Sequence, residues 1–143
     1  MVFHEQIFDL TDGLLLGTFD LSLDPKGRLI IPKRYRAVFE AGLYVTYGDE
    51  ENLVIYALPE FNKLREVIQK LDVTDFENTR RQDRFFSGYV TSLDKLGRFL
   101  LTPHMRGSVG LVEGGEVTLT GSGNRMKIWA PQRWDEYVRG SRG

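Results

Sequence analysis

One short pattern that could bind phosphate occurs twice in this chain of 143 residues. Asp24 and Arg28 stand at the ends of an Asp-Pro-Lys-Gly turn, and Asp94 and Arg98 stand at the ends of an Asp-Lys-Leu-Gly turn. An arginine guanidinium can bind a phosphate or a guanine edge through two parallel hydrogen bonds, whereas a carboxylate repels phosphate. The pattern therefore predicts either arginines that bind an anion, each oriented by its aspartate, or ion pairs that only staple their turns.

Each copy of the pattern predicts a strand, a tight turn and a second strand. The aspartate caps the first turn position, Pro25 fixes φ in the first copy, and Gly27 and Gly97 suit the fourth position. Ser, Leu, Asp, Gly and Arg recur at the same places in both copies, and three apolar residues follow each arginine. We therefore expect Asp24, Gly27, Asp94 and Gly97 to set the orientation of the two arginines.

Basic charge is concentrated beside both turns. Residues 24–36 carry a net charge of +4 and residues 94–106 a net charge of +2, whereas the whole chain carries −1. Such a distribution is typical of a local basic surface rather than of a uniformly basic nucleic-acid binder. The second copy is less basic because Leu96 stands where the first copy has Lys26. The candidate contacts to DNA are Lys26, Arg28, Lys33, Arg34, Lys95 and Arg98.

The duplication extends beyond the turns, which predicts two similar halves related by a pseudo-two-fold axis. Arg36 aligns with Arg106 at an offset of 70, and residues 42–57 align with 115–130 at an offset of 73. Apolar alternation predicts strands, and apolar residues at helical spacing predict helices. The strands are expected at 16–23, 29–31, 43–47, 53–56, 88–93, 98–101, 116–120 and 126–129, and the helices at 33–40, 59–71, 74–86, after Pro103 and after Pro131.

Two helix starts have recognisable caps in the sequence. Thr74 with Glu77 predicts a capping box, and Thr102 before Pro103 predicts an N-cap followed by proline at the first helical position. The chain then divides into an N-terminal extension (1–15) that could be unordered, a first repeat (16–60), a helical connector (61–87), a second repeat (88–132) and a C-terminal helix and tail (133–143).

Composition excludes several classes of function. The absence of cysteine excludes disulfides and thiolate chemistry, and no apolar run is long enough for a membrane helix. His4 and His104 lie 100 residues apart without a carboxylate cluster, so a metal site is not expected. Gly121-Ser122-Gly123 fits a hairpin loop, since no Lys-Ser/Thr follows as in a phosphate-binding loop. We expect a cytoplasmic protein that is not an enzyme and takes no cofactor or small-molecule substrate.

The doubled motif resembles the two repeats of the MraZ family. The resemblance rests on residues 24–32 and 94–101, is supported by 16–19, 55–59 and 128–130, and covers about 16–138. It implies an intrachain duplicated swapped-hairpin β-barrel of the AbrB and MazE type (a SpoVT-AbrB domain). It also implies a repressor of the bacterial division and cell-wall gene cluster that binds repeated promoter boxes in double-stranded DNA. Such a regulator would be nucleoid-associated and would form a ring-like homo-oligomer, an octamer or similar. Thr102 departs from the proline usual there.

Alternatives remain open from the sequence. The residues alone do not decide whether Asp24 and Asp94 only staple their turns. They weigh against DNA contact by Arg28, Arg98 and Lys26, and it is the resemblance that favours this contact. A ring-forming structural or protein-interaction module without specific DNA recognition is the main alternative, and an antitoxin-like module is disfavoured by the two motif copies. A second basic cluster, Arg80, Arg81 and Arg84, fits a solvated or subunit-facing helix better than DNA contact. The aromatic residues fit core or inter-subunit packing better than base stacking.

Overall fold

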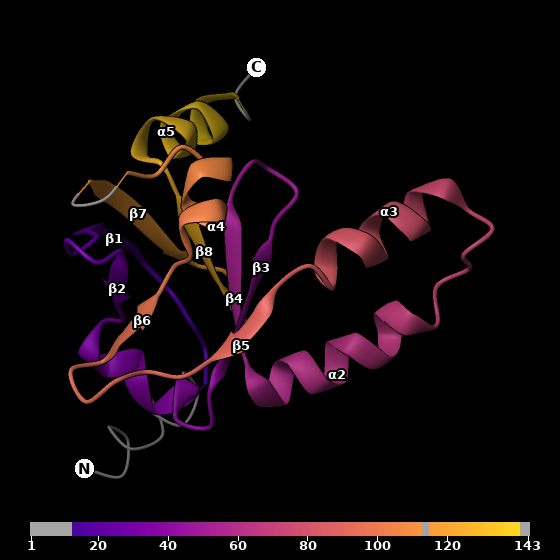
Figure 1. Ribbon diagram of the computed structural model, residues 1–143, viewed down its shortest axis with the longest axis horizontal. Helices are drawn as coiled ribbons and strands as arrows, with labels where there is room; N and C mark the ends of the chain where they lie inside the picture. The colour runs from indigo at the N-terminus through magenta and orange to yellow at the C-terminus, as the bar shows by residue number, and fades with distance from the viewer. Residues whose placement is uncertain (1–12, 113–114, 141–143) are drawn as a thin grey trace, which may run out of the picture.

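The computed structural model describes residues 13–112 and 115–140, and it combines antiparallel sheets with helices (Figure 1). Six strands form one sheet in the order β1-β7-β8-β4-β3-β5, and two more form a ribbon, β2-β6. The strands are β1 (Thr18–Ser22), β2 (Arg28–Ile30), β3 (Leu43–Tyr47), β4 (Leu53–Ala57), β5 (Tyr89–Thr91), β6 (Arg98–Leu100), β7 (Glu116–Gly121) and β8 (Met126–Trp129). The predicted α+β class is confirmed. Within the described residues, β1 and β5 are the edges of the larger sheet, which is therefore open.

Most strand pairs join one half of the chain to the other. Strands β1 and β7 pair with Thr18 opposite Thr120, β3 and β5 pair with Leu43 opposite Thr91, and β4 and β8 also pair. The ribbon pairs β2 with β6 in the same way. Among the strand pairs of the described residues, only the β3–β4 and β7–β8 hairpins lie within one half. The two halves are therefore interleaved.

The main core lies between the six-stranded sheet and the β2–β6 ribbon. Leu29 and Phe99 are directly opposite each other in the ribbon and point inward, as alternation along a strand requires. All five residues of β4 are buried, because the second face of this strand is covered as well. On this second face, Val54 and Tyr56 of β4 pack with Tyr44 and Phe85 in a second cluster.

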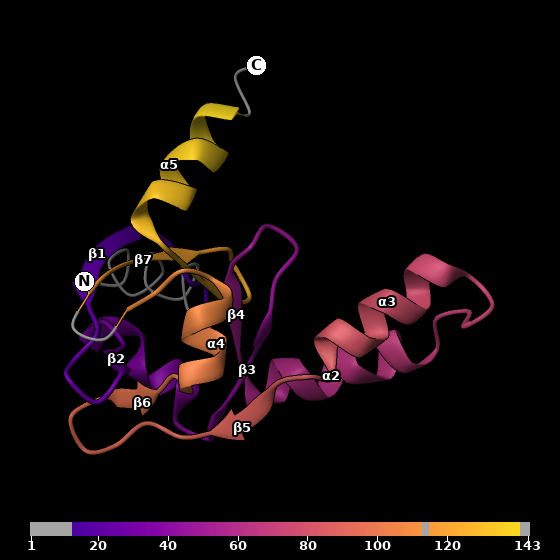
Figure 2. The ribbon, with the colours of Figure 1, turned by 45° about the horizontal axis from the view of Figure 1, so that its top comes forward.

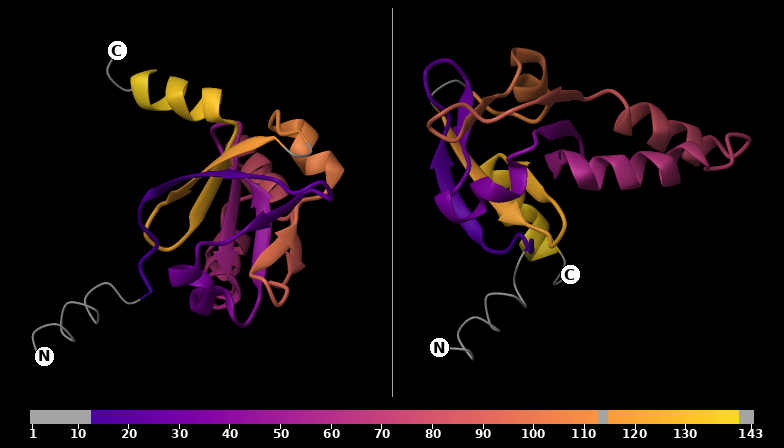
Figure 3. Two further views of the ribbon diagram at one scale, coloured as in Figure 1. Left: turned by 90° about the vertical axis from the view of Figure 1, so that its left-hand side faces the viewer. Right: turned by 90° about the horizontal axis from the view of Figure 1, so that it is seen from below.

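Helices connect and flank the strands. They are η1 (Lys33–Phe39), α2 (Leu58–Gln69), α3 (Phe76–Phe85), α4 (Pro103–Ser108) and α5 (Pro131–Gly140). The α2–α3 hairpin projects from the strands, and α5 extends from another side of the body (Figures 1 and 2). Figure 3 shows the same projection of the hairpin from below. No helix in the described ranges is long and apolar enough to cross a membrane.

The second cluster attaches the α2–α3 hairpin to the sheet. The ring of Phe85 lies 5.7 Å from Tyr44 and 5.8 Å from Phe61, measured between ring centroids. The carbonyl oxygen of Phe85 accepts hydrogen bonds from the Tyr44 hydroxyl at 2.7 Å and from the Thr46 hydroxyl at 2.8 Å. The base of the hairpin is therefore fixed by both aromatic packing and buried hydrogen bonds.

Several local predictions need correction. The capping box is wrong: Asp75 is the N-cap of α3 and accepts from the Glu77 amide, while Thr74 donates its hydroxyl to Asp72. The predicted helix after Pro32 is present as a 3₁₀ helix, and Val67, which has helical spacing with the apolar residues of α2, is 59% exposed.

Other local predictions hold. The Thr102 cap of α4 is confirmed, since its hydroxyl accepts from the Met105 amide at 3.3 Å. Of the expected N-terminal extension, residues 1–12 lie outside the described residues. Leu15, at its end, is buried and exchanges backbone hydrogen bonds with Gly123.

Candidate nucleic-acid interface

The first turn is held by its aspartate. Oδ1 of Asp24 accepts from the backbone amides of Lys26 and Arg28, both at 2.9 Å. The Gly27 amide closes the turn on the Asp24 carbonyl at 2.9 Å, and Gly27 has a φ of +83°, which glycine adopts without a side-chain penalty. Oδ2 of Asp24 remains to receive the Arg28 guanidinium, whose Nε lies 2.6 Å away. One carboxylate thus shapes the turn and orients the arginine.

The second turn repeats this arrangement. Oδ1 of Asp94 accepts from the amides of Leu96 and Arg98 at 2.9 Å, and Gly97 has a φ of +82°. The Arg98 Nε lies 3.0 Å from Asp94 Oδ2. The two copies of the sequence motif are therefore two copies of one local structure.

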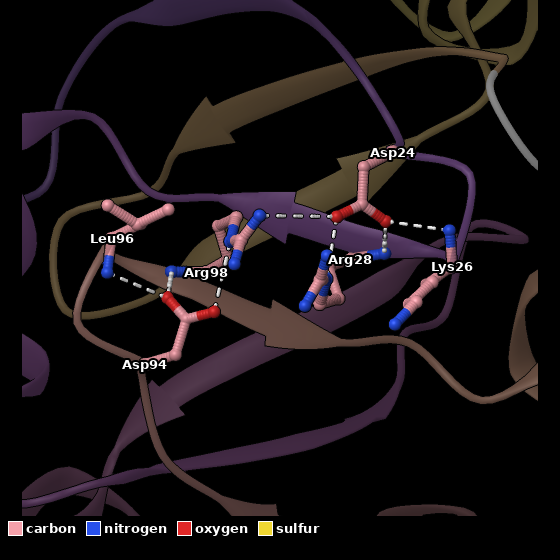
Figure 4. A network of polar contacts seen from close by, with 6 residues as sticks. All are labelled: Asp24, Lys26, Arg28, Asp94, Leu96 and Arg98. Carbon is pink, nitrogen blue, oxygen red and sulfur yellow. Dashed lines mark hydrogen bonds and ion pairs between the residues drawn. The ribbon is translucent and has the colours of Figure 1, made fainter.

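The ribbon brings the two motifs together (Figure 4). Because β2 and β6 are antiparallel, Arg28 lies opposite Leu100 and Arg98 lies opposite Ile30. The two arginines are therefore diagonal neighbours on the outer face of the ribbon, a relation in which long side chains can reach each other. Arg98 Nη1 also lies 3.7 Å from Oδ2 of Asp24, so this carboxylate faces both arginines.

The arginines are oriented yet accessible. The side chains of Arg28 and Arg98 are 30% and 26% exposed, and in each the Nε is used by the aspartate of its own turn. Ile30 and Leu100, exposed on the same face, are 36% and 46% exposed. The outer face of the ribbon thus offers guanidinium groups flanked by apolar side chains.

Hydrogen bonding keeps both aspartates ionised. The backbone amide of Arg28 is the main cause that lowers the pKa of Asp24, and the amide of Arg98 does the same for Asp94. Desolvation acts in the opposite direction, and the guanidiniums add to the lowering. Both carboxylates are therefore ionised at neutral pH and available to their arginines.

The other predicted residues lie outside the cluster formed by Asp24, Arg28, Asp94 and Arg98. Lys26 and Lys95 are exposed on the tips of the two turns, and Lys33 and Arg34 are exposed on η1, where the Arg34 guanidinium lies 5.5 Å from the Tyr35 ring centre. Their side chains make no described contact with Arg28 or Arg98.

The basic cluster on α3 has other described partners. Arg84 pairs with Asp49 on the β3–β4 loop, and Arg80 lies 4.0 Å from Glu77 and over the ring of Phe76. These contacts tie Arg84 to the sheet and Arg80 to its own helix.

The sequence interpretation missed one buried charge. The net charge of residues 94–106 includes Arg106, but this residue is 5% exposed and donates from Nε to the Leu101 carbonyl at 2.9 Å. Its alignment with Arg36 was a usable signal, because Arg36 makes the matching bond to Ile31. In the ranges that the structure covers, no group of three or more His, Cys, Asp or Glu could hold a metal ion.

Sequence comparison with known proteins identifies the family of this chain. A family model described as "MraZ protein, putative antitoxin-like" matches residues 14–85. A Thermus thermophilus protein named transcriptional regulator MraZ is 39% identical over 119 residues, which are 82% of this chain and 83% of that protein. Proteins of the same name from Dictyoglomus turgidum and a Parafrankia species are 37% and 35% identical over 126 residues, covering 87% of this chain and 84% and 87% of theirs. The chain therefore belongs to the MraZ family.

Proposed function

We propose that this protein is a DNA-binding transcriptional regulator that contacts repeated promoter boxes of the division and cell-wall gene cluster, most simply as a repressor. The observation that carries the proposal is the pair of oriented arginines, Arg28 and Arg98, side by side on one exposed ribbon. A two-stranded ribbon fits the major groove of B-DNA, where arginine reads guanine and apolar groups contact thymine methyls. Lys26 and Lys95 on the flanking turns would contact phosphates. The names of the relatives support the regulatory role.

Asp24 and Asp94 act in this proposal as orienting groups rather than as DNA contacts. In each aspartate, Oδ1 accepts hydrogen bonds from two backbone amides and Oδ2 accepts one from an arginine. The carboxylate therefore has little capacity to accept a further hydrogen bond from a DNA base. Their negative charge would repel phosphate, whereas fixing a guanidinium before binding lowers the ordering cost of association.

We propose also that the fold is the swapped-hairpin arrangement of the AbrB and MazE type, with both partners supplied by one chain. The pairing of β1 with β7 and of β3 with β5 supports it, because each repeat inserts a strand beside a hairpin of the other. The β2–β6 ribbon covers the core between them.

Self-association into a ring would turn one small interface into several. A single ribbon neutralises few phosphates, and affinity for DNA rises with their number. Linked copies on repeated boxes would gain avidity without new contacts. The exposed apolar side chains of the projecting hairpin support an assembly surface there, since Val67, Val73 and Phe76 are 59%, 61% and 76% exposed.

The same apolar surface favours the second candidate function, a ring-forming protein-interaction module without specific DNA recognition. Light scattering on the intact protein separates assembly from DNA binding. A particle of several subunits that fails to bind duplex DNA would favour the module, and a monomer would remove the avidity argument.

The direct test is fluorescence anisotropy or gel shift with a duplex that carries the repeated promoter boxes, against a scrambled duplex of equal length. Replacing both Arg28 and Arg98 by alanine should cost about 1–3 kcal/mol of binding free energy per arginine and flatten the salt dependence. Arg139→Ala is the matched control, because Arg139 is exposed on α5, outside both the ribbon and the projecting hairpin. Equal affinity of the double variant and the wild type would exclude the assigned residues. No binding by the wild type at low salt would exclude DNA binding itself.

A further inference from the structure

Two arginines outside the turns occupy equivalent places in the two repeats. Arg36 lies in η1 and Arg106 in α4. Each donates from Nε, at 2.9 Å, to a backbone carbonyl just beyond the ribbon strand of its own repeat: Arg36 to Ile31 and Arg106 to Leu101. The repetition of this bond in both halves indicates a shared role.

Each guanidinium packs against the turn of the other repeat. A Cβ added to Gly27 would lie only 2.6 Å from Cζ of Arg106, so the Arg106 side chain lies directly against this turn. A Cβ added to Gly97 would lie 2.6 Å from Cδ of Arg36. Arg106 thus supports the turn of the first repeat, and Arg36 supports the turn of the second.

Backbone hydrogen bonds close each contact into a set of three residues. The amide of Ile31, whose carbonyl receives Arg36, donates to the Gly97 carbonyl at 2.9 Å. The amide of Leu101, whose carbonyl receives Arg106, donates to the Gly27 carbonyl at 3.0 Å. In each set, the arginine, the end of its strand and the turn of the opposite repeat therefore hold one another in place. The protein contains this set of contacts in both repeats.

We propose that Arg36 and Arg106 are positioning residues, each of which fixes the DNA-contacting turn of the opposite repeat. This inference rests on the proposed function for its consequence, since the turns carry Arg28 and Arg98. It assigns Arg36 and Arg106 a role different from that of a basic surface that binds phosphate. It also makes the two turns interdependent: disturbing one repeat loosens the arginine displayed by the other.

Hydrogen exchange in the DNA-free protein tests the crossed assignment. In Arg36→Met, the amides of Leu96 and Arg98, which bond to Asp94, should exchange at least tenfold faster. The amides of Lys26 and Arg28 should remain unchanged. Arg106→Met should give the reverse pattern, and Arg106→Lys replaces it if the buried methionine variant does not fold. Faster exchange confined to the turn of the same repeat, or in neither turn, would overturn the proposal.

DNA affinity supplies a second measurement that separates positioning from direct contact. Lysine keeps the charge but has no donor at the Nε position, so Arg36→Lys should bind the promoter duplex at least tenfold more weakly, much as Arg36→Met does. Restoration of wild-type affinity by lysine would identify a phosphate contact and refute positioning. If the wild type itself does not bind DNA, the proposed function fails, and the exchange experiment still decides whether the arginines position the turns.

Discussion

The contact between Gly27 and Arg106 predicts a large loss of stability for Gly27→Ala. Alanine at a φ of +83° costs about 1–2 kcal/mol, because its Cβ approaches the following carbonyl oxygen. The new Cβ would also lie 2.6 Å from Cζ of Arg106, which is 5% exposed, so the guanidinium must shift within packed surroundings. Displacing Arg106 breaks its bond to Leu101, which contributes about 1.5–3 kcal/mol as a hydrogen bond from a charged donor. The total is about 2.5–5 kcal/mol.

Gly123→Ala is the matched control for this experiment. Gly123 has a φ of +86°, yet an added Cβ would have no heavy atom within 4 Å. This variant should therefore lose only the conformational part, about 1–2 kcal/mol. The difference between the two variants isolates the collision with Arg106.

Urea unfolding followed by the fluorescence of the two tryptophans, of which Trp129 is buried, measures both variants. One protein concentration is used, because assembly would add its own stability. Gly27→Ala should unfold at clearly lower urea than Gly123→Ala, with an unchanged slope. Equal midpoints for the two variants would refute the reasoning, since they would mean that Arg106 does not pack against the first turn in solution.

Three further outcomes follow from the geometry. The pKa values of Asp24 and Asp94 are lowered in the folded protein, so these carboxylates stabilise the fold fully above the unfolded pKa of about 3.9. This stabilisation is lost as the pH falls through the lower folded pKa values. A carboxyl NMR titration measures the folded pKa values, and values at or above about 3.9 would contradict the prediction. Thr102→Ala should lower the free energy of unfolding by about 1 kcal/mol, because α4 loses its N-cap. Thr74→Ala should change it by less than about 0.5 kcal/mol, because the Thr74 hydroxyl bonds to Asp72 and caps no helix. Urea unfolding curves measure both. Phe85→Ala should cost about 3–5 kcal/mol and release the α2–α3 hairpin, seen as rapid proteolysis within it, and a protease-resistant hairpin in this variant would contradict that role.

The sequence predicted the strands and the doubled turn well because local chemistry determines them. Asp24, Gly27 and Arg28 form a complete structural unit within five residues, so the motif could be interpreted without the rest of the fold. The same holds for the Thr102 cap. The capping box failed for a local reason too: Asp72 competes for the Thr74 hydroxyl, and Asp75 takes the cap instead.

What the residues alone could not predict depends on pairing between the halves. The sharing of Asp24 between Arg28 and Arg98 follows from the register of β2 against β6, which no local pattern specifies. The burial of Arg106 likewise depends on a turn 79 residues away, at Gly27. A count of basic residues treats Arg106 and Lys26 alike, although one is buried and the other is exposed.

The pairing of β1 with β7 also determines when the protein can fold during its synthesis. Thr18 finds its partner at Thr120, so β1 is made about 100 residues before the strand it needs. At the usual rate of translation this interval lasts roughly 5–20 s, during which Phe19 and Leu21 have no sheet to pack on. The interleaving that places both arginines on one ribbon therefore delays the native fold until nearly the whole chain has left the ribosome.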